Sequence, residues 1–293
     1  MLIIHLYRLA VAAILTLSVY DIVHEITLGF ALVNITPTHY DDFESEVSKS
    51  EVDKVFAQPF YLFADGGQSF VFVSEDNQYV LKLFKFHHLR IPPWMQVFPV
   101  WGKLNDYKIK KMAFKRGILQ ETFLSYKNAF KFFKEESLLL DLNLSNKPNR
   151  YHSTLTIYDI QKRPFKIDPN TTPFALQKKV QLFEATIKKK LKENDLQFVA
   201  DAVCNCMDLL ATRINKGFID NDCYLHKNIG LVGSKPMLLD IGTLQMIDNL
   251  DHKSKVHQIE YVMKSIFDLI ADYPELKEQI NSHWEYTKNT TLK

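Results

Sequence analysis

The stretch from Gly217 to Leu244, GFIDNDCYLHKNIGLVGSKPMLLDIGTL, is the feature that most constrains how this chain can fold. A short apolar pair at 218–219 runs into a polar loop, and two further apolar runs separated by turn residues predict a hairpin. The loop and the hairpin carry four polar candidates: Asp220, Asp222, Asn228 and Asp240. Carboxylate and amide oxygens are the ligands that Mg²⁺ accepts. This stretch therefore predicts a cation site with a base beside it.

Length and composition are those of a globular protein. The 293 residues can bury a sizeable core, in one large domain or two modest ones. A hydrophobic fraction of 46% and a charged fraction of 24% argue against disorder. Lys and Arg number 36 against 34 Asp and Glu, so the net charge gives no reason to expect nucleic acid as a partner. The three cysteines are an odd number without metal-binding spacing, which favours a reducing compartment.

Residues 1–33 are expected to form an apolar N-terminal helix. The first twenty, MLIIHLYRLAVAAILTLSVY, are long enough to span a bilayer, which makes this segment a candidate membrane anchor and the protein membrane-associated. Arg8 before an apolar run is also typical of a signal sequence, and a buried N-terminal helix is the third alternative. The topology stays open at this point. Residues 34–55 are polar and mostly acidic, which predicts a linker.

From Tyr61 onward the pattern becomes that of strands. The runs YLF, SFVFVS and YVLKLFKF are separated by ADGGQ and EDNQ, which predicts a three-stranded meander. Gly66 and Gly67 let the first turn approach a ligand closely and present its N–H groups to phosphate oxygens. Lys82 is a charged residue inside an apolar third strand, and its ammonium could reach phosphates if it faces a cleft. The alternative is an exposed edge lysine, which is the interpretation of Lys85.

A basic and aromatic insertion at 87–116 follows, either as a membrane-surface or partner patch or as a solvated connection. An amphipathic helix is then expected from about 115 to 140, because an apolar stripe recurs at spacings of four and three: Leu119, Phe123, Tyr126, Phe130 and Phe133. Glu121 lies on the opposite face of this helix, where it either meets a partner or is solvated. Glu135 and Glu136 are alternatives for the same role.

The rest of the chain predicts two more strands and several helices. Segments 153–159 and 172–183 would complete a five-stranded sheet. A cap at Asn194 or Asp195 begins a helix that Gly217 ends, and a further helix covers 256–270. The first of these helices leads directly into the loop that carries the candidate cation ligands.

The order of these motifs resembles the protein-kinase-like fold, including its atypical bacterial branches, over about residues 56–248. In that family a lysine of the third strand and a glutamate of the following helix position the ATP phosphates. A loop Asp serves as base, and a loop Asn and a second Asp hold Mg²⁺. The resemblance implies catalytic roles for Lys82, Glu121 and Asp222, and metal ligation by Asn228 and Asp240. It also implies nucleotide contacts from the glycine turn and the strands around it: Gly66, Gly67, Gln68, Ser69, Val73, Val80 and Lys82.

The fold implied by this resemblance is α+β and two-lobed. An N-lobe at 56–180, with the insertion at 87–116, would contain a five-stranded antiparallel sheet and one helix. A reduced, mainly helical C-lobe at 181–293 would carry the catalytic and metal loops. The apolar helix at 1–33 and the linker at 34–55 would precede both lobes.

Three departures from the family pattern bear on activity. Gln68 and Val71 stand where the family has further glycines, and Ile241 replaces the phenylalanine of Asp-Phe-Gly. Asp222 precedes Asn228 by six residues, where the family has five. The first hypothesis is an ATP- and Mg²⁺-dependent phosphotransferase that acts on a hydroxyl of an unknown protein or small-molecule substrate. The alternatives are a pseudokinase that binds nucleotide or acts as a scaffold, and a membrane-tethered interaction protein.

Overall fold

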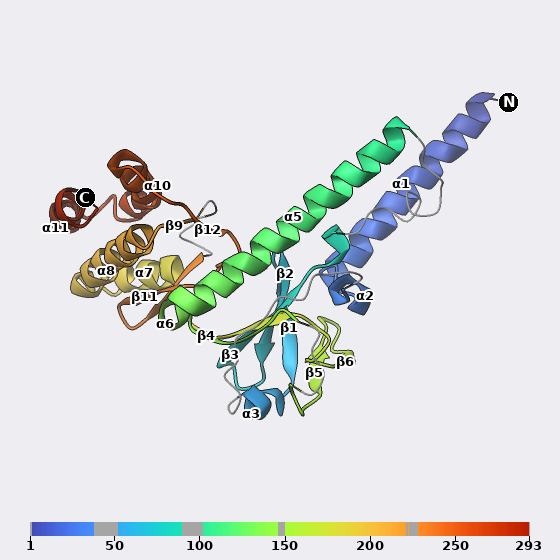
Figure 1. The fold of residues 1–293 in the computed structure, drawn as a ribbon, viewed down its shortest axis with the longest axis horizontal. Coiled ribbons are helices and arrows are strands. Elements are labelled where there is room, and N and C mark those ends of the chain that lie inside the picture. The colour runs from blue at the N-terminus through green and yellow to red at the C-terminus, as the bar shows by residue number, and fades with distance from the viewer. Residues whose placement is uncertain are drawn as a thin grey trace. The chain divides into compact units, whose positions relative to one another are not determined.

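A computed structural model of the chain describes the following ranges: 2–37, 52–89, 102–145, 150–220, 222 and 228–292. The chain divides into two compact units (Figure 1). Residues 1–116 and 141–177 form the first, and residues 117–140 and 178–293 form the second. The expected lobes at 56–180 and 181–293 divide the chain differently. Residues 117–140 belong to the second unit because their buried side chains, such as Ser125, bond to its strand segments.

The first unit contains a curled sheet of seven strands in the order β4-β7-β3-β2-β1-β5-β6. Their bounds are β1 Phe60–Asp65, β2 Ser69–Ser74, β3 Tyr79–Phe84, β4 Leu139–Asn143, β5 Leu155–Tyr158, β6 Pro164–Ile167 and β7 Phe174–Lys178. The meander β1-β2-β3 forms as expected, with antiparallel pairing.

This sheet differs from the five-stranded antiparallel sheet that the sequence predicts. Strand β1 pairs with β5 in parallel, so the sheet is mixed. Strand β4 begins at Leu139, where the apolar periodicity predicts the end of a helix, and β6 begins with Pro164, a residue that argues against a strand interior. Both strands are therefore absent from the prediction.

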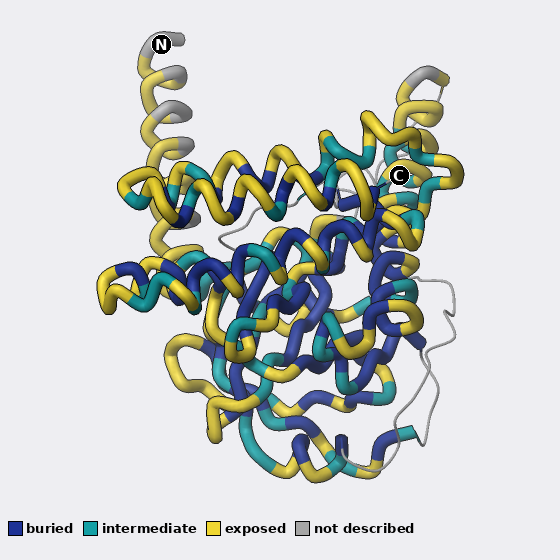
Figure 2. The backbone as a smooth tube through the Cα atoms, turned by 90° about the vertical axis from the view of Figure 1, so that its left-hand side faces the viewer, coloured by how far each residue is buried: buried dark blue, intermediate teal, exposed yellow. Residues whose placement is uncertain are grey.

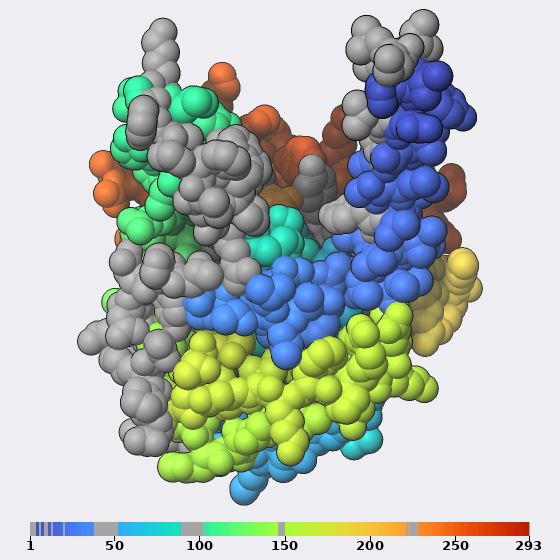
Figure 3. All heavy atoms as spheres, turned by 90° about the vertical axis from the view of Figure 1, so that its right-hand side faces the viewer, coloured from blue at the N-terminus to red at the C-terminus, as the bar shows by residue number. Residues whose placement is uncertain are grey.

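Aromatic residues fill the core on one face of this sheet. Phe30 packs edge-to-face on Phe70 and Phe72 at ring-centroid distances of 5.3 and 5.4 Å, and on Phe165 of β6 at 5.6 Å. Figure 3 shows the blue segment around residue 30 lying directly against the yellow-green strands β5 and β6. The chain immediately after the first helix thus belongs to the folded body of the first unit.

Helix α1 (Leu2–Thr27) ends where Leu28 and Gly29 adopt positive φ angles, and the amide of Gly29 bonds to the carbonyl of His24 at 3.2 Å. Helix α2 (Leu32–Ile35) follows. Among the described residues, no helix is both long and apolar enough to cross a membrane. The middle of the expected linker lies outside the described residues, and its end is helix α3 (Val52–Phe56).

The short 3₁₀ turn η1 (His87–Leu89) follows β3, and residues 90–101 of the predicted insertion lie outside the described part of the chain. Helix α5 (Lys103–Phe132) is longer at its start than the sequence predicts and continues from the first unit into the second. Its expected apolar stripe is buried: Leu119, Phe123, Tyr126 and Phe130, followed by Phe133. The short helix α6 (Lys134–Ser137) connects α5 to β4.

The second unit is mainly helical, with four helices around one apolar core: α7 Phe183–Lys192, α8 Leu196–Asn215, α10 His252–Leu269 and α11 Pro274–Tyr286. Asp195 caps α8 by accepting from the amide of Phe198 at 3.3 Å, and Gly217, with φ +81°, follows its end. A π-helical turn, Thr287–Thr291, follows α11. Figure 2 shows buried segments in dark blue along the strands and the inner faces of these helices.

Five short strands complete the second unit: β8 Gln181–Leu182, β9 Phe218–Asp220, β10 Ile229–Val232, β11 Lys235–Leu238 and β12 Leu244–Met246. Strands β10 and β11 form the predicted hairpin, and β10 also pairs with β8. Strands β9 and β12 pair separately, with Asp220 opposite Leu244. These two small sheets hold the stretch from which the functional prediction starts.

Candidate functional site

Three of the predicted nucleotide-contacting residues share one face of the first unit's sheet. Val73 pairs with Val80, and Lys82 pairs with Val71 two positions further along the strands. Successive strand residues point to opposite faces, so these four residues lie on the face opposite the phenylalanine core. The Lys82 side chain is largely buried, with 9% of the residue exposed. The strand register thus places Val73, Val80 and Lys82 on one face, and their contact with a nucleotide stays a prediction.

The glycine turn between β1 and β2 is tight. The amide of Gly66 donates to the carbonyl of Ser69 at 3.0 Å, and a Cβ added at Gly66 would lie 2.9 Å from that oxygen. Among the described residues, no atom lies within 4 Å of a Cβ added at Gly67. Gln68 is half-buried and Ser69 is buried. Close backbone approach therefore requires glycine at position 66, whereas the described residues leave position 67 uncrowded.

Lys85 differs from its predicted role as an exposed edge residue. Its side chain is buried, and its Nζ lies 2.5 Å from Asp65 Oδ1 at the end of β1 and 4.7 Å from the centre of the Phe70 ring. Its main-chain amide also bonds to the carbonyl of Gln68 at 2.9 Å. Lys85 therefore holds the glycine turn against the end of β3.

In the second unit, the hairpin brings Asn228 beside the residue that precedes Asp240. Ile229 pairs with Leu238, and the amide of Leu239 donates to the carbonyl of Asn228 at 2.8 Å. Asn228 is buried, whereas Asp240 is exposed and accepts from the amide of Gly242 at 3.2 Å. The structure thus places the two predicted metal ligands at the base of one hairpin.

Asp222 belongs to the same group, although residues 223–227 of its loop lie outside the described residues. The side-chain Nδ2 of Asn228 donates to the main-chain carbonyl of Asp222. This bond uses the nitrogen of the Asn228 amide, so its oxygen is the atom left to contact a cation. An amide oxygen and an exposed carboxylate are hard donors, which fits Mg²⁺ chemistry.

Helix α5 contacts the segment that follows Asp240. The hydroxyl of Ser125 donates to the carbonyl of Ile241 and accepts from the amide of Leu244 at 2.7 Å. Burial raises the pKa of the neighbouring Tyr126, and the negative charge of Asp240 raises it further. Asp240 therefore lies close to α5, in a segment whose backbone a buried hydroxyl fixes.

Glu121 lies on the exposed face of α5, one turn before Ser125. Of the two alternatives, Glu135 is exposed, and Glu136 lies 3.8 Å from the ammonium of Lys216. Glu121 and Lys82 belong to different units, so their predicted pairing stays a prediction.

The structure adds residues that the sequence argument missed. Arg213, fully buried on α8, pairs with Asp220, and Thr243 donates to the same carboxylate. Arg213 lies between Leu210 and Ile214 on the apolar side of a helix, and a charged residue at such a position is the signal that could have revealed a buried partner. The carboxylate of Asp220, one of the candidate acids of the loop, is therefore bonded to other side chains inside the protein.

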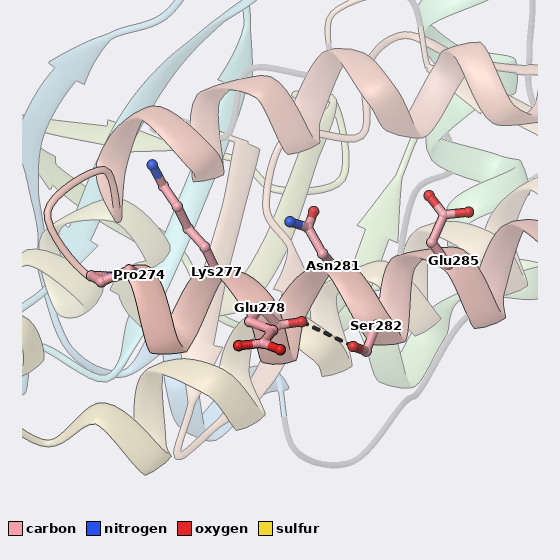
Figure 4. A pocket seen from close by; sticks show the side chains of 6 residues that line it. All are labelled: Pro274, Lys277, Glu278, Asn281, Ser282 and Glu285. Carbon is pink, nitrogen blue, oxygen red and sulfur yellow. Dashed lines mark hydrogen bonds between the residues drawn. The ribbon is translucent and has the colours of Figure 1, made fainter.

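Other features of the described residues do not point to a site. They contain no group of three or more His, Cys, Asp or Glu arranged to hold a metal ion. A hollow of about 540 Å³ lies on α11, and Figure 4 shows the six residues that line it: Pro274, Lys277, Glu278, Asn281, Ser282 and Glu285. All six come from one helix, and none is a predicted site residue.

No family model matches the chain, and no curated protein matches it. Among solved structures, the chain is similar to the bifunctional kinase-methyltransferase WbdD, with 11% sequence identity and a TM-score of 0.34. The match covers 76% of this chain and 42% of that one, so the chain spans less than half the length of that protein. The chain itself is an α+β protein with a curled, seven-stranded mixed sheet and a helical second unit.

Proposed function

We propose that this chain is an ATP- and Mg²⁺-dependent phosphotransferase of the protein-kinase-like superfamily. The observation that carries the proposal is that Asn228, at the base of one hairpin, bonds to the main chain of both Asp222 and Leu239, the residue directly before Asp240. A base and two hard oxygen ligands within one loop cluster are the parts that phosphoryl transfer needs from this side of a nucleotide. The sequence motif order supplies the rest of the argument.

Each residue has a stated role in this proposal. Asn228 and Asp240 would hold Mg²⁺, which when bound neutralises charge on the phosphates. The carboxylate of Asp222 would accept the proton of an attacking hydroxyl, on a protein or a small molecule. Lys82 would neutralise phosphate oxygens, Glu121 would position that lysine, and Val73 and Val80 would contact the adenine.

The first unit supports the nucleotide part of the proposal by its own geometry. One sheet face offers an apolar pair beside a largely buried lysine, and the described residues leave Gly67 of the glycine turn uncrowded. Apolar surface with a few placed polar groups is the usual lining of a nucleotide site. The position of Lys82 opposite Val71, on the face that carries Val73 and Val80, is therefore the observation in this unit that supports nucleotide binding.

The test is phosphoryl transfer from labelled ATP to pools of proteins, lipids and small molecules, with Asp240→Ala as the paired control. We expect the natural chain to transfer phosphate and the Asp240→Ala variant not to, because this substitution removes the proposed metal ligand. Equal signals from the two proteins would contradict the proposal.

A catalytically impaired pseudokinase is the second candidate. It is favoured by the environment of Asp222, whose main-chain carbonyl is bonded by the buried Asn228 side chain, in a loop one residue longer than the family's. Mg²⁺-dependent ATP binding without transfer to any pool would support this candidate over the first.

A further inference from the structure

The carboxylate of Asp220 lies within reach of three hydrogen-bond donors. Its Oδ1 accepts from the Thr243 hydroxyl at 2.5 Å and from the Asp222 amide at 3.0 Å. Its Oδ2 lies 3.5 Å from Nη1 of Arg213. Asp220 is 5% exposed and Arg213 is fully buried. All four residues belong to the second unit.

Two of the three donors come from the segments that carry the candidate site, and the third, Arg213, comes from α8. Asp222 is in the loop after β9, and Thr243 lies between Asp240 and β12. Asp220 itself is paired with Leu244, the first residue of β12. One carboxylate therefore bonds the backbone of the base-bearing loop and a side chain of the segment that carries Asp240.

A need for stability alone does not explain a buried Arg–Asp pair. Removing two charges from water is costly, and well-packed apolar residues of the same volume often stabilise a fold equally well or better. A carboxylate that accepts several directed hydrogen bonds does something an apolar residue cannot, because it fixes the angles and distances of its donors. The Asp220 carboxylate is therefore suited to fixing the positions of the groups that donate to it.

We propose that Asp220 is a positioning residue that couples the Asp222 loop to the Asp240 segment through Thr243, with Arg213 holding its carboxylate in place. The inference rests on the proposed function, in which Asp222 is the base and Asp240 a metal ligand. Asp220 itself is not the base, because its carboxylate is buried and already accepts three donors.

The matched pair for the test is Thr243→Val and Thr243→Ser. Valine keeps the shape of threonine but removes the hydroxyl, whereas serine keeps the hydroxyl. Two readouts are needed: hydrogen exchange of the peptides covering 218–222 and 240–247 without nucleotide, and the Mg²⁺ concentration required for ATP to raise the melting temperature.

We expect Thr243→Val to speed exchange in both peptides and to raise the required Mg²⁺ concentration by about tenfold or more, the usual effect of losing a bond that orients a metal ligand. The rise in melting temperature that ATP causes without Mg²⁺ should be the same in Thr243→Val as in the natural chain. Thr243→Ser should match the natural chain in both readouts. If Thr243→Val also matches the natural chain, the positioning role is overturned.

A merely structural role has a different signature. It would speed exchange throughout the helices α8 and α10, as expected of Ile280→Val, a core substitution on α11 that serves as the destabilised control. That outcome for Thr243→Val would overturn the inference. Should Thr243→Val fail to fold, Asp220→Asn, which keeps the shape but removes the charge, is measured in the same two ways.

The two proposals fail separately. If the natural chain shows no Mg²⁺-dependent ATP effect, the proposed function is wrong, and the exchange comparison alone then decides whether Asp220 couples the two segments. If the natural chain shows that effect while the Thr243 variants do not differ, only the positioning inference is wrong.

Discussion

The main-chain carbonyl of Asn228 accepts a 2.8 Å hydrogen bond from the amide of Leu239. This bond closes the β10–β11 hairpin at its base and brings Asn228 beside the chain that leads directly into Asp240. Asn228 and Leu239, at the two ends of the hairpin in the sequence, thus become neighbours in the fold. The side chains of Asn228 and Asp240 are an amide and a carboxylate, and both residues belong to the same compact unit.

Replacing Lys82 by Met is expected to abolish most of the stabilisation by ATP. Methionine keeps the apolar stem but lacks the ammonium that would neutralise phosphate oxygens. Nucleotide present at a hundred times its Kd stabilises a protein by about 2.7 kcal/mol, so the loss is measurable as a melting-temperature shift. Lys166→Met, on the exposed part of β6, is the matched control and should keep the full ATP effect. Undiminished protection of Lys82→Met by ATP would exclude Lys82 from the nucleotide site.

Replacing Asp240 by Asn is expected to weaken the Mg²⁺ dependence of ATP binding while leaving the fold intact. Asparagine preserves the shape and can still accept from the Gly242 amide, but it removes the negative charge that attracts a hard cation. Titration of Mg²⁺ at fixed ATP, followed by thermal shift, measures the change. Asp248→Asn, an exposed acid beyond β12, should behave like the natural chain. An identical Mg²⁺ requirement in both variants would argue against Asp240 as a ligand.

The two glycines of the β1–β2 turn should differ in their tolerance of alanine. Gly66→Ala places a Cβ 2.9 Å from the Ser69 carbonyl, so the backbone must shift, at a cost of about 1–3 kcal/mol. The Cβ of Gly67→Ala meets no atom of the described residues within 4 Å, so this variant should change the free energy of unfolding by less than about 0.5 kcal/mol. Urea unfolding of the two variants measures the difference. An equal loss of unfolding free energy in both variants would contradict the close approach of Gly66 to the Ser69 carbonyl.

Cys204 should react slowly with alkylating reagents. Burial raises the pKa of its thiol to about 11, and the nearby Asp208 and Asp201 contribute to the shift. The thiolate is the nucleophile, so alkylation at pH 8 should be at least about tenfold slower in the native protein than in denaturant. Site-resolved mass spectrometry after timed labelling with iodoacetamide measures both rates. Similar rates in the two states would contradict the assigned burial.

The same shift predicts a dependence of stability on alkaline pH. The native state binds the Cys204 proton more tightly than the unfolded chain, so the free energy of unfolding should fall as the pH rises from about 9 toward 11. Urea unfolding across this range should show a smaller decrease for Cys204→Ala, which has no thiol to titrate. A decrease of the same size in both proteins would assign it to other groups.

Local patterns in the sequence predicted the elements that carry the candidate site. The period-2 runs gave β1, β2 and β3, and the placement of Val73, Val80 and Lys82 on one face follows from alternation along the strands. The helical stripe on α5 and a cap of α8 at Asn194 or Asp195 were also predicted, and Asp195 is the cap in the structure, because spacing and capping act over only a few residues.

Several features could not be predicted because they depend on residues far apart in the chain. The parallel pairing of β1 with β5 and the strand at Leu139 depend on neighbours that no local pattern reveals. The burial of Lys85 depends on Asp65, at the far end of the β1–β2 hairpin, which offers its carboxylate 2.5 Å away. The bonds of Ser125 to Ile241 and Leu244 join parts of the chain more than a hundred residues apart.

The sequence by itself determined which residue types gather around the hairpin, because the apolar runs, the turn and the polar loop are encoded within Gly217 to Leu244. Only the tertiary structure decided which acid of that loop has its carboxylate bonded inside the protein. Asp220 and Asp222 are the same type of residue and lie two positions apart in the sequence. The buried Arg213 and the Thr243 hydroxyl engage the carboxylate of Asp220, and Asp222 contributes its backbone amide to the same group. A buried charge requires partners, and those partners come from a helix before the loop and a strand segment after it.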